Sequence, residues 1–174
     1  MALSFPVILY FAYNPATLKL LKLVFTANWI YLWASAILLS LFLSSKATAL
    51  QLNKLKKQYN IINPPVAVAA YFTGRIIFLF LYELFFRGVL LFSLMAIAGN
   101  AISIIINVVL YTTLHACCTV KEIMATIPFG IVICLLCMVS NSVWPAIILH
   151  TAVAITTECM IVFSIKKHPK LYMV

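Results

Sequence analysis

Long apolar runs dominate the chain. Stretches without a charged residue cover residues 23–45, 88–120 and 123–157. A helix needs about 20 apolar residues to cross the hydrocarbon of a bilayer, so several runs are long enough to span it. The runs lack the alternation of period two that marks the strands of a membrane barrel. The pattern therefore predicts an all-α fold, a polytopic transmembrane helical bundle.

Turn residues divide the runs into about five spans. The predicted spans are residues 23–43, 66–98, 101–119, 123–139 and 144–165. The second would be about 50 Å long, beyond the roughly 30 Å hydrocarbon core, so we expect it to tilt, to extend past the membrane or to break near Gly88. Residues 3–13 are apolar but too short to span alone, and they form a further N-terminal segment. We expect residues 1–174 to form a single membrane domain.

Composition and charge agree with a membrane location. With 66% hydrophobic and 9% charged residues, the chain has more apolar surface than a soluble fold of 174 residues can bury. The net charge of +9 would suit nucleic acid, but four lysines gather in the polar loop 44–63 and three in the tail KKHPK. Such clusters beside apolar spans report orientation, so the loop and the C-terminal tail are predicted to be cytoplasmic. The lipid bilayer is an expected partner, and nucleic acid is not.

One predicted span contains two opposite charges. Glu83 and Arg87, in the stretch LFLYELFFRGVLLF, are four residues apart and therefore lie on one face of a helix. They are suited to form a self-neutralising structural pair. Apolar residues of similar volume would usually serve stability as well, however, and an ionisable residue inside a membrane is a functional hypothesis by default.

Two histidines lie in other predicted spans. His115 ends the stretch YTTLHA, and His150 lies in SVWPAIILHTA. A single membrane histidine is often only a hydrogen-bonded helix contact. Two histidines together with a glutamate and an arginine, on three helices, favour a site. The CxxC of Cys134 and Cys137 lies among apolar residues, where cysteine packs as a small apolar side chain.

The order of these residues resembles that of a known family. The stretches that carry the resemblance are, in order, ELFFRG, YTTLHA, PFG and NSVWPAIILH. They are similar to the CPBP family, which comprises the type II CAAX prenyl proteases and the bacteriocin-processing (Abi) proteins. The motifs of this family are EExxxR, FxxxH and HxxxN or HxxxD. The resemblance covers about residues 66–165. It implies an intramembrane endopeptidase whose catalytic residues are Glu83, Arg87, His115 and His150, with Tyr111 at the aromatic position of the second motif.

Two positions depart from the family pattern. The first glutamate of EExxxR is Tyr82, and the asparagine or aspartate after the last histidine is Ala154. In the family the first glutamate is held to activate water. A phenol has an ordinary pKa of about 10 and is a poor general base at neutral pH. The resemblance therefore predicts the family scaffold without its usual base.

Three functions stay open at this point. The first is an endopeptidase of the CAAX-protease or Abi type that hydrolyses a peptide bond in a prenylated protein C-terminus or a small membrane-associated peptide. The second is a catalytically inactive pseudoprotease, acting as a peptide-binding or bacteriocin-immunity membrane protein. The third is a structural or transporter-like bundle. The sequence requires no cofactor; zinc held by Glu83, His115 and His150 is an alternative, because these residue types bind zinc, although no HExxH is present.

Overall fold

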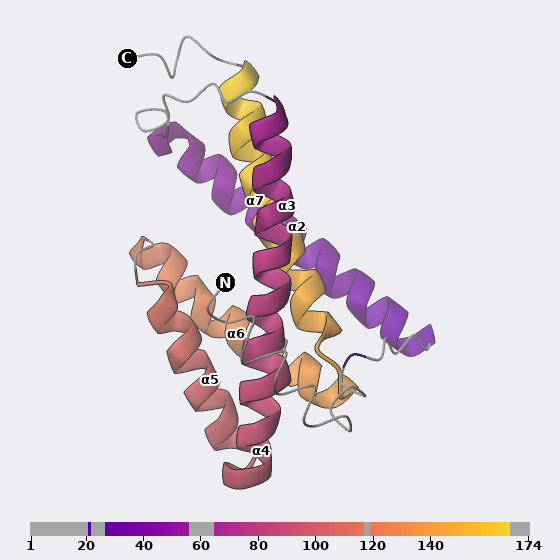
Figure 1. The fold of residues 1–174 in the computed structure, drawn as a ribbon. Helices are drawn as coiled ribbons and strands as arrows, with labels where there is room; N and C mark the ends of the chain where they lie inside the picture. Colours follow the sequence, from indigo (N-terminus) through magenta and orange to yellow (C-terminus); the bar gives the residue numbers. More distant parts are fainter. Residues whose placement is uncertain (1–20, 22–26, 56–64, 117–118, 168–174) are drawn as a thin grey trace. The chain divides into compact units, whose positions relative to one another are not determined.

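The computed structural model describes residues 21, 27–55, 65–116 and 119–167, and this part of the chain is helical and contains no strand (Figure 1). The all-α prediction is confirmed. The elements in chain order are α2 (Ala27–Leu55), α3 (Pro65–Glu83), the π-helix η2 (Leu84–Leu91), α4 (Phe92–Ala98), α5 (Asn100–Leu114), α6 (Val120–Ser140) and α7 (Trp144–Lys167).

Several helices are long and apolar enough to cross a membrane. Within the described residues these are Val68–Ala98, Val120–Ser140 and Trp144–Phe163, and two shorter apolar helices cover Ala34–Lys46 and Asn100–Leu114. The chain is therefore an integral membrane protein, and the predicted total of five spans stays a prediction. Residues 3–13 and the tail 168–174 lie outside the described residues. The cytoplasmic location of the loop and of the tail stays a prediction.

The first predicted loop is wrong over its whole described length, residues 44–55. The sequence predicted a polar loop from residue 44, but α2 continues as a helix to Leu55. The polar side chains at this point are satisfied inside the fold: Thr48 donates to the carbonyl oxygen of Ser44 at 2.8 Å, and the Ser44 hydroxyl lies 2.6 Å from that of Thr157 in α7. Because both hydroxyls have hydrogen-bond partners inside the fold, they are accommodated within the helix without contact with water. Residues 56–63 of the predicted loop lie outside the described part.

The third predicted span is too long. It was expected to reach residue 119, but α5 ends at Leu114, with His115 as its C-cap. A capping box then starts α6, in which the Thr119 hydroxyl accepts from the backbone N–H of Glu122 and the Glu122 carboxylate accepts from the backbone N–H of Thr119. This reciprocal capping fixes the start of α6.

The long second helix neither breaks nor remains regular. The helical run from α3 through α4 is continuous, and it widens into the π-helix η2 around Gly88. Within η2, the side-chain amide of Asn107 donates to the backbone carbonyl of Phe86 at 2.6 Å. A side chain that donates to a backbone carbonyl inside a helix disturbs the regular backbone hydrogen bonds between residues i and i−4. A break near Gly88, one of the three alternatives, is wrong, and the helix is π-helical at this position instead.

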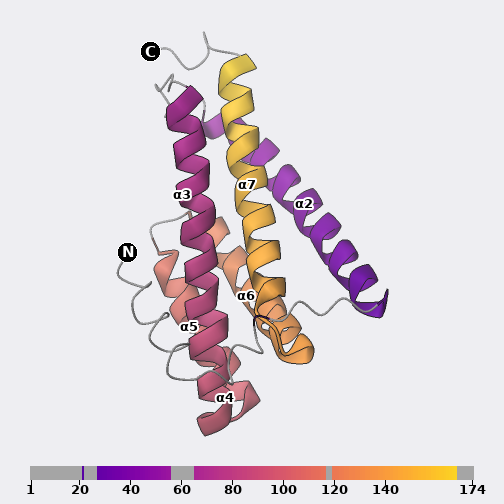
Figure 2. The ribbon, with the colours of Figure 1, turned by 45° about the vertical axis from the view of Figure 1, so that its right-hand side comes forward.

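The chain divides into two compact units, and each is described by itself. Among the described residues, the first unit runs from Leu79 to Ile147 and includes Leu21. In it α5 and α6 lie side by side (Figure 2). A Cβ added at Gly130 of α6 would come within 3.3 Å of the Tyr111 ring of α5, so this glycine makes room for that ring. Tyr82, Phe86 and Tyr111 form a buried cluster in this unit.

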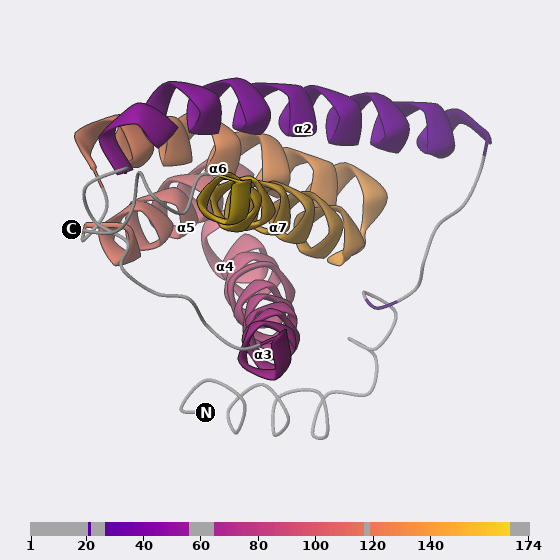
Figure 3. The same ribbon diagram turned by 90° about the horizontal axis from the view of Figure 1, so that it is seen from above.

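The second unit contains α2, α3 up to Phe78, and α7 from Ile148. Figure 3 shows α7 between α2 and α3. Side-chain bonds join α7 to both neighbours, through Ser44 and Thr157 on one side and through Arg75 and Glu158 on the other. The expectation of a single membrane domain stays a prediction.

Candidate active site

Glu83 and Arg87 form the ion pair that their spacing predicted. Glu83 is the last residue of α3, and Arg87 lies in η2. The Oε2 atom of Glu83 lies 3.0 Å from the Nη1 atom of Arg87, and neither side chain has any exposed surface. Two charges this deeply buried are tolerated only as a pair.

An aromatic ring supports the other side of the guanidinium. The Cζ atom of Arg87 lies 4.6 Å from the centre of the Tyr111 ring and 5.8 Å from that of Phe86. Within the described residues, Nε and Nη2 of Arg87 form no hydrogen bond. The arginine is therefore held by one carboxylate and by cation–π attraction to Tyr111.

Tyr82 occupies the position of the missing glutamate. Its side chain is 5% exposed, and its ring stacks on that of Phe86, with 4.6 Å between the ring centres. The Tyr111 ring lies 6.1 Å away. The phenol is thus packed as part of an aromatic cluster beside the ion pair.

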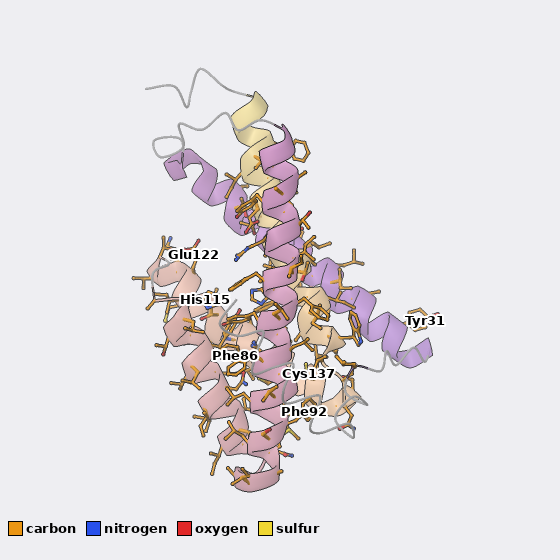
Figure 4. All side chains as sticks on the ribbon, viewed as in Figure 1. Tyr31, Phe86, Phe92, His115, Glu122 and Cys137 are labelled. Carbon is orange, nitrogen blue, oxygen red and sulfur yellow. The ribbon has the colours of Figure 1, made fainter. Side chains whose placement is uncertain are left out.

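His115 is attached to the same cluster through Tyr111. Its Nδ1 atom lies 2.8 Å from the backbone carbonyl oxygen of Tyr111, and the two ring centres are 4.6 Å apart. Because a carbonyl only accepts, Nδ1 carries a proton, and in the neutral ring Nε2 then holds the lone pair. The half-buried His115 and the buried Phe86 are labelled in Figure 4. The first unit therefore brings together Tyr82, Glu83, Arg87 and His115.

Comparison with known families gives this grouping a context. Residues 64–156 match the family model described as type II CAAX prenyl endopeptidase Rce1-like, which is more than half of the chain. The chain belongs to the Rce1-like family. No curated protein and no solved structure matches it. The matched interval contains every candidate site residue, and the family is one of CAAX-type intramembrane proteases.

The last Rce1-like motif lies in α7. His150 is 8% exposed, and Ala154, which stands where the family has asparagine or aspartate, is half-buried. Both residues belong to the second unit, whereas the other candidate residues belong to the first. The catalytic roles of all four candidates stay predictions.

A zinc site needs several His, Cys, Asp or Glu side chains close together. Within the described part of this Rce1-like chain, no three His, Cys, Asp or Glu side chains are grouped as metal ligands. Cys134 and Cys137 are fully buried free thiols, as expected for cysteines that pack in a core. The zinc alternative stays a prediction without a ligand set in this part of the chain.

Sequence reasoning missed the partners of two polar residues. Asn107 is fully buried, where it binds the Phe86 carbonyl and accepts from the Cys134 thiol at 3.5 Å. Arg75 of α3 pairs with Glu158 of α7. A polar asparagine and a charged arginine inside apolar spans indicate that each has a partner. The partners themselves are distant in sequence.

Proposed function

We propose that this Rce1-like protein binds prenylated or other membrane-associated peptides and does not hydrolyse them. Tyr82 carries the proposal, because its ring is buried and stacked on Phe86 where the family motif has the glutamate that activates water. Peptide hydrolysis needs a base that takes a proton from water. A phenol of ordinary pKa, about 10, is protonated at neutral pH and does not serve as that base.

The neighbouring carboxylate is a poor substitute. Glu83 is fully buried, and its Oε2 atom lies 3.0 Å from the guanidinium of Arg87. A general base must come within about 2.6–3.2 Å of its water. The Glu83 carboxylate is instead engaged by the buried guanidinium of Arg87. The pair is better suited to hold η2 in place than to perform acid–base chemistry.

Other features of the site favour binding. The ion pair and the aromatic cluster are buried together in the first unit, and the His115 ring beside them is oriented by the Tyr111 carbonyl. These properties are those of a recognition site in an apolar setting.

Hydrolysis is the second candidate function, with Glu83, Arg87, His115 and His150 as the catalytic residues. One observation favours it: the π-helix η2 begins directly after Glu83, and π-helical segments concentrate at functional sites. A shift of η2 to α-helical geometry would turn Glu83 relative to Arg87. Glu83 would then take the proton from water, and the histidines would bind the water and the carbonyl oxygen.

A combined binding and mass measurement tests the proposal. Protein in lipid nanodiscs is incubated with a farnesylated peptide that carries a photo-cross-linker, and the same peptide without the farnesyl group is the control. We expect cross-linking of the farnesylated peptide, which is recovered at its intact mass. Cleavage that Glu83→Gln abolishes would establish the second candidate instead, and no cross-linking above the control would overturn the proposal.

A further inference from the structure

A second ion pair, between Arg75 and Glu158, lies in the second unit. Nε of Arg75 in α3 donates to Oε1 of Glu158 in α7 at 2.8 Å, and the side chains are 34% and 18% exposed. Both residues lie inside apolar helices that are long enough to span, Val68–Ala98 and Trp144–Phe163. Ionisable residues at such positions are costly and usually functional.

The arginine keeps most of its hydrogen-bonding capacity. A guanidinium has five N–H donors, and within the described residues that of Arg75 makes a single hydrogen bond, through Nε. The two Nη groups form a planar fork that matches both oxygens of a carboxylate. On the other side of the pair, Oε2 of Glu158 is buried and has no hydrogen-bond partner among the described residues. The pair therefore satisfies neither residue fully.

The surface beside the arginine is open. A Cβ added at Gly74 would meet no heavy atom within 4 Å among the described residues. Two aromatic side chains on this part of α3 are exposed, Tyr71 at 54% and Phe78 at 48%, and Cζ of Arg75 lies 5.8 Å from the Phe78 ring. An accessible guanidinium bordered by aromatic surface suits an anion attached to an apolar molecule.

The depth of the pair argues for a peptide rather than a lipid headgroup. Arg75 follows Pro65, the first residue of α3, by ten residues, and Glu158 precedes Lys167, the last residue of α7, by nine. At 1.5 Å per residue these positions lie about 15 Å and about 14 Å inside the ends of their helices. Headgroup phosphates lie outside the hydrocarbon. A carboxylate that ends a peptide anchored in the apolar layer therefore suits this position better than the phosphate of a headgroup.

We propose that Arg75 binds the free C-terminal carboxylate of the membrane-associated peptide, replacing Glu158 as its partner. The identity of the peptide rests on the proposed function; the carboxylate specificity rests on the pair itself. Glu158 holds the arginine while no peptide is bound and competes with the incoming carboxylate. Removal of Arg75 and removal of Glu158 are therefore expected to change affinity in opposite directions.

The test compares two farnesylated peptides that differ only in ending in a carboxylate or in an amide. Their affinities are measured in nanodiscs of neutral lipid. A charge-assisted bidentate contact is expected to favour the carboxylate by about tenfold in the wild-type protein. Arg75→Gln removes this preference and leaves the affinity for the amide unchanged, whereas Glu158→Gln increases the affinity for the carboxylate. Lys121→Gln, at an exposed lysine of α6, is the control and behaves as the wild type.

A double variant keeps the test informative if Arg75→Gln alone fails to fold. The double variant Arg75→Gln/Glu158→Gln leaves no unpaired charge, and it must also lack the preference. Equal wild-type affinity for the two peptides, or a preference that survives in the double variant, would overturn the inference and leave peptide binding intact. If the wild type binds neither peptide, both the proposed function and this site are refuted. An Arg75-dependent affinity for anionic lipid in place of the carboxylate preference would also overturn it.

Discussion

Replacing Arg87 by methionine removes a guanidinium that is fully buried between Glu83 and the Tyr111 ring. The methionine side chain is apolar and flexible enough to fill most of the space. The carboxylate of Glu83 is left buried without its cation, and breaking one partner of such a pair costs about 3–5 kcal/mol. The lost cation–π contact is worth about 2 kcal/mol or more when desolvated. It is counted within that range and not added to it, because both effects arise from one side chain.

The double variant Glu83→Gln/Arg87→Met separates charge from packing. It removes both charges, so most of the lost stability should return, because neutral replacements of buried pairs are often close to neutral in free energy. The free energy of unfolding is measured by titrating the purified protein in mixed micelles with a denaturing detergent. Lys121→Met, at an exposed position, should stay within about 0.5 kcal/mol of the wild type. An Arg87→Met loss below about 1 kcal/mol, or no recovery in the double variant, would refute this reasoning.

Two further predictions concern the packing of the first unit. Gly130→Ala places a Cβ 3.3 Å from the Tyr111 ring. Because that ring is 1% exposed and packed against Arg87, it has little room to move, and the change should lower the free energy of unfolding by about 1–3 kcal/mol. Gly74→Ala meets no heavy atom among the described residues and should stabilise its helix by up to about 1 kcal/mol, and a Gly130→Ala protein as stable as Gly74→Ala would contradict the packing. Asn107→Ala leaves the Phe86 carbonyl without its side-chain donor and should lower the free energy of unfolding by about 1–3 kcal/mol. It should also speed the hydrogen exchange of backbone amides in η2. Unchanged exchange there would show that Asn107 does not maintain the π-helix.

Local patterns explain what the sequence predicted well. The apolar runs predict helices because lipid leaves few other ways to satisfy the backbone. The pairing of Glu83 with Arg87 follows from helical spacing alone, and the structure places their charged atoms 3.0 Å apart. A feature that depends on one element and its period is therefore readable from the sequence.

Features that join separate elements were not readable in this way. Within the π-helix, the carbonyl of Phe86 accepts from the side chain of Asn107 in α5, 21 residues later in the sequence. Arg75 and Glu158 are 83 residues apart, and neither residue's spacing predicts the other. The continuation of α2 depends on Ser44 finding a hydroxyl partner in α7. In each case a tertiary contact overrides or completes a local preference.

The central claim is that Tyr82 keeps this Rce1-like protein from cutting the peptides that it binds. The most direct measurement is product formation, followed by mass spectrometry, from a farnesylated peptide with the wild type, Tyr82→Glu and Tyr82→Gln. The account predicts no product from the wild type or from the uncharged Tyr82→Gln, and measurable product from Tyr82→Glu, which supplies the base. Product from the wild type at the rate of the Tyr82→Glu variant would contradict the account.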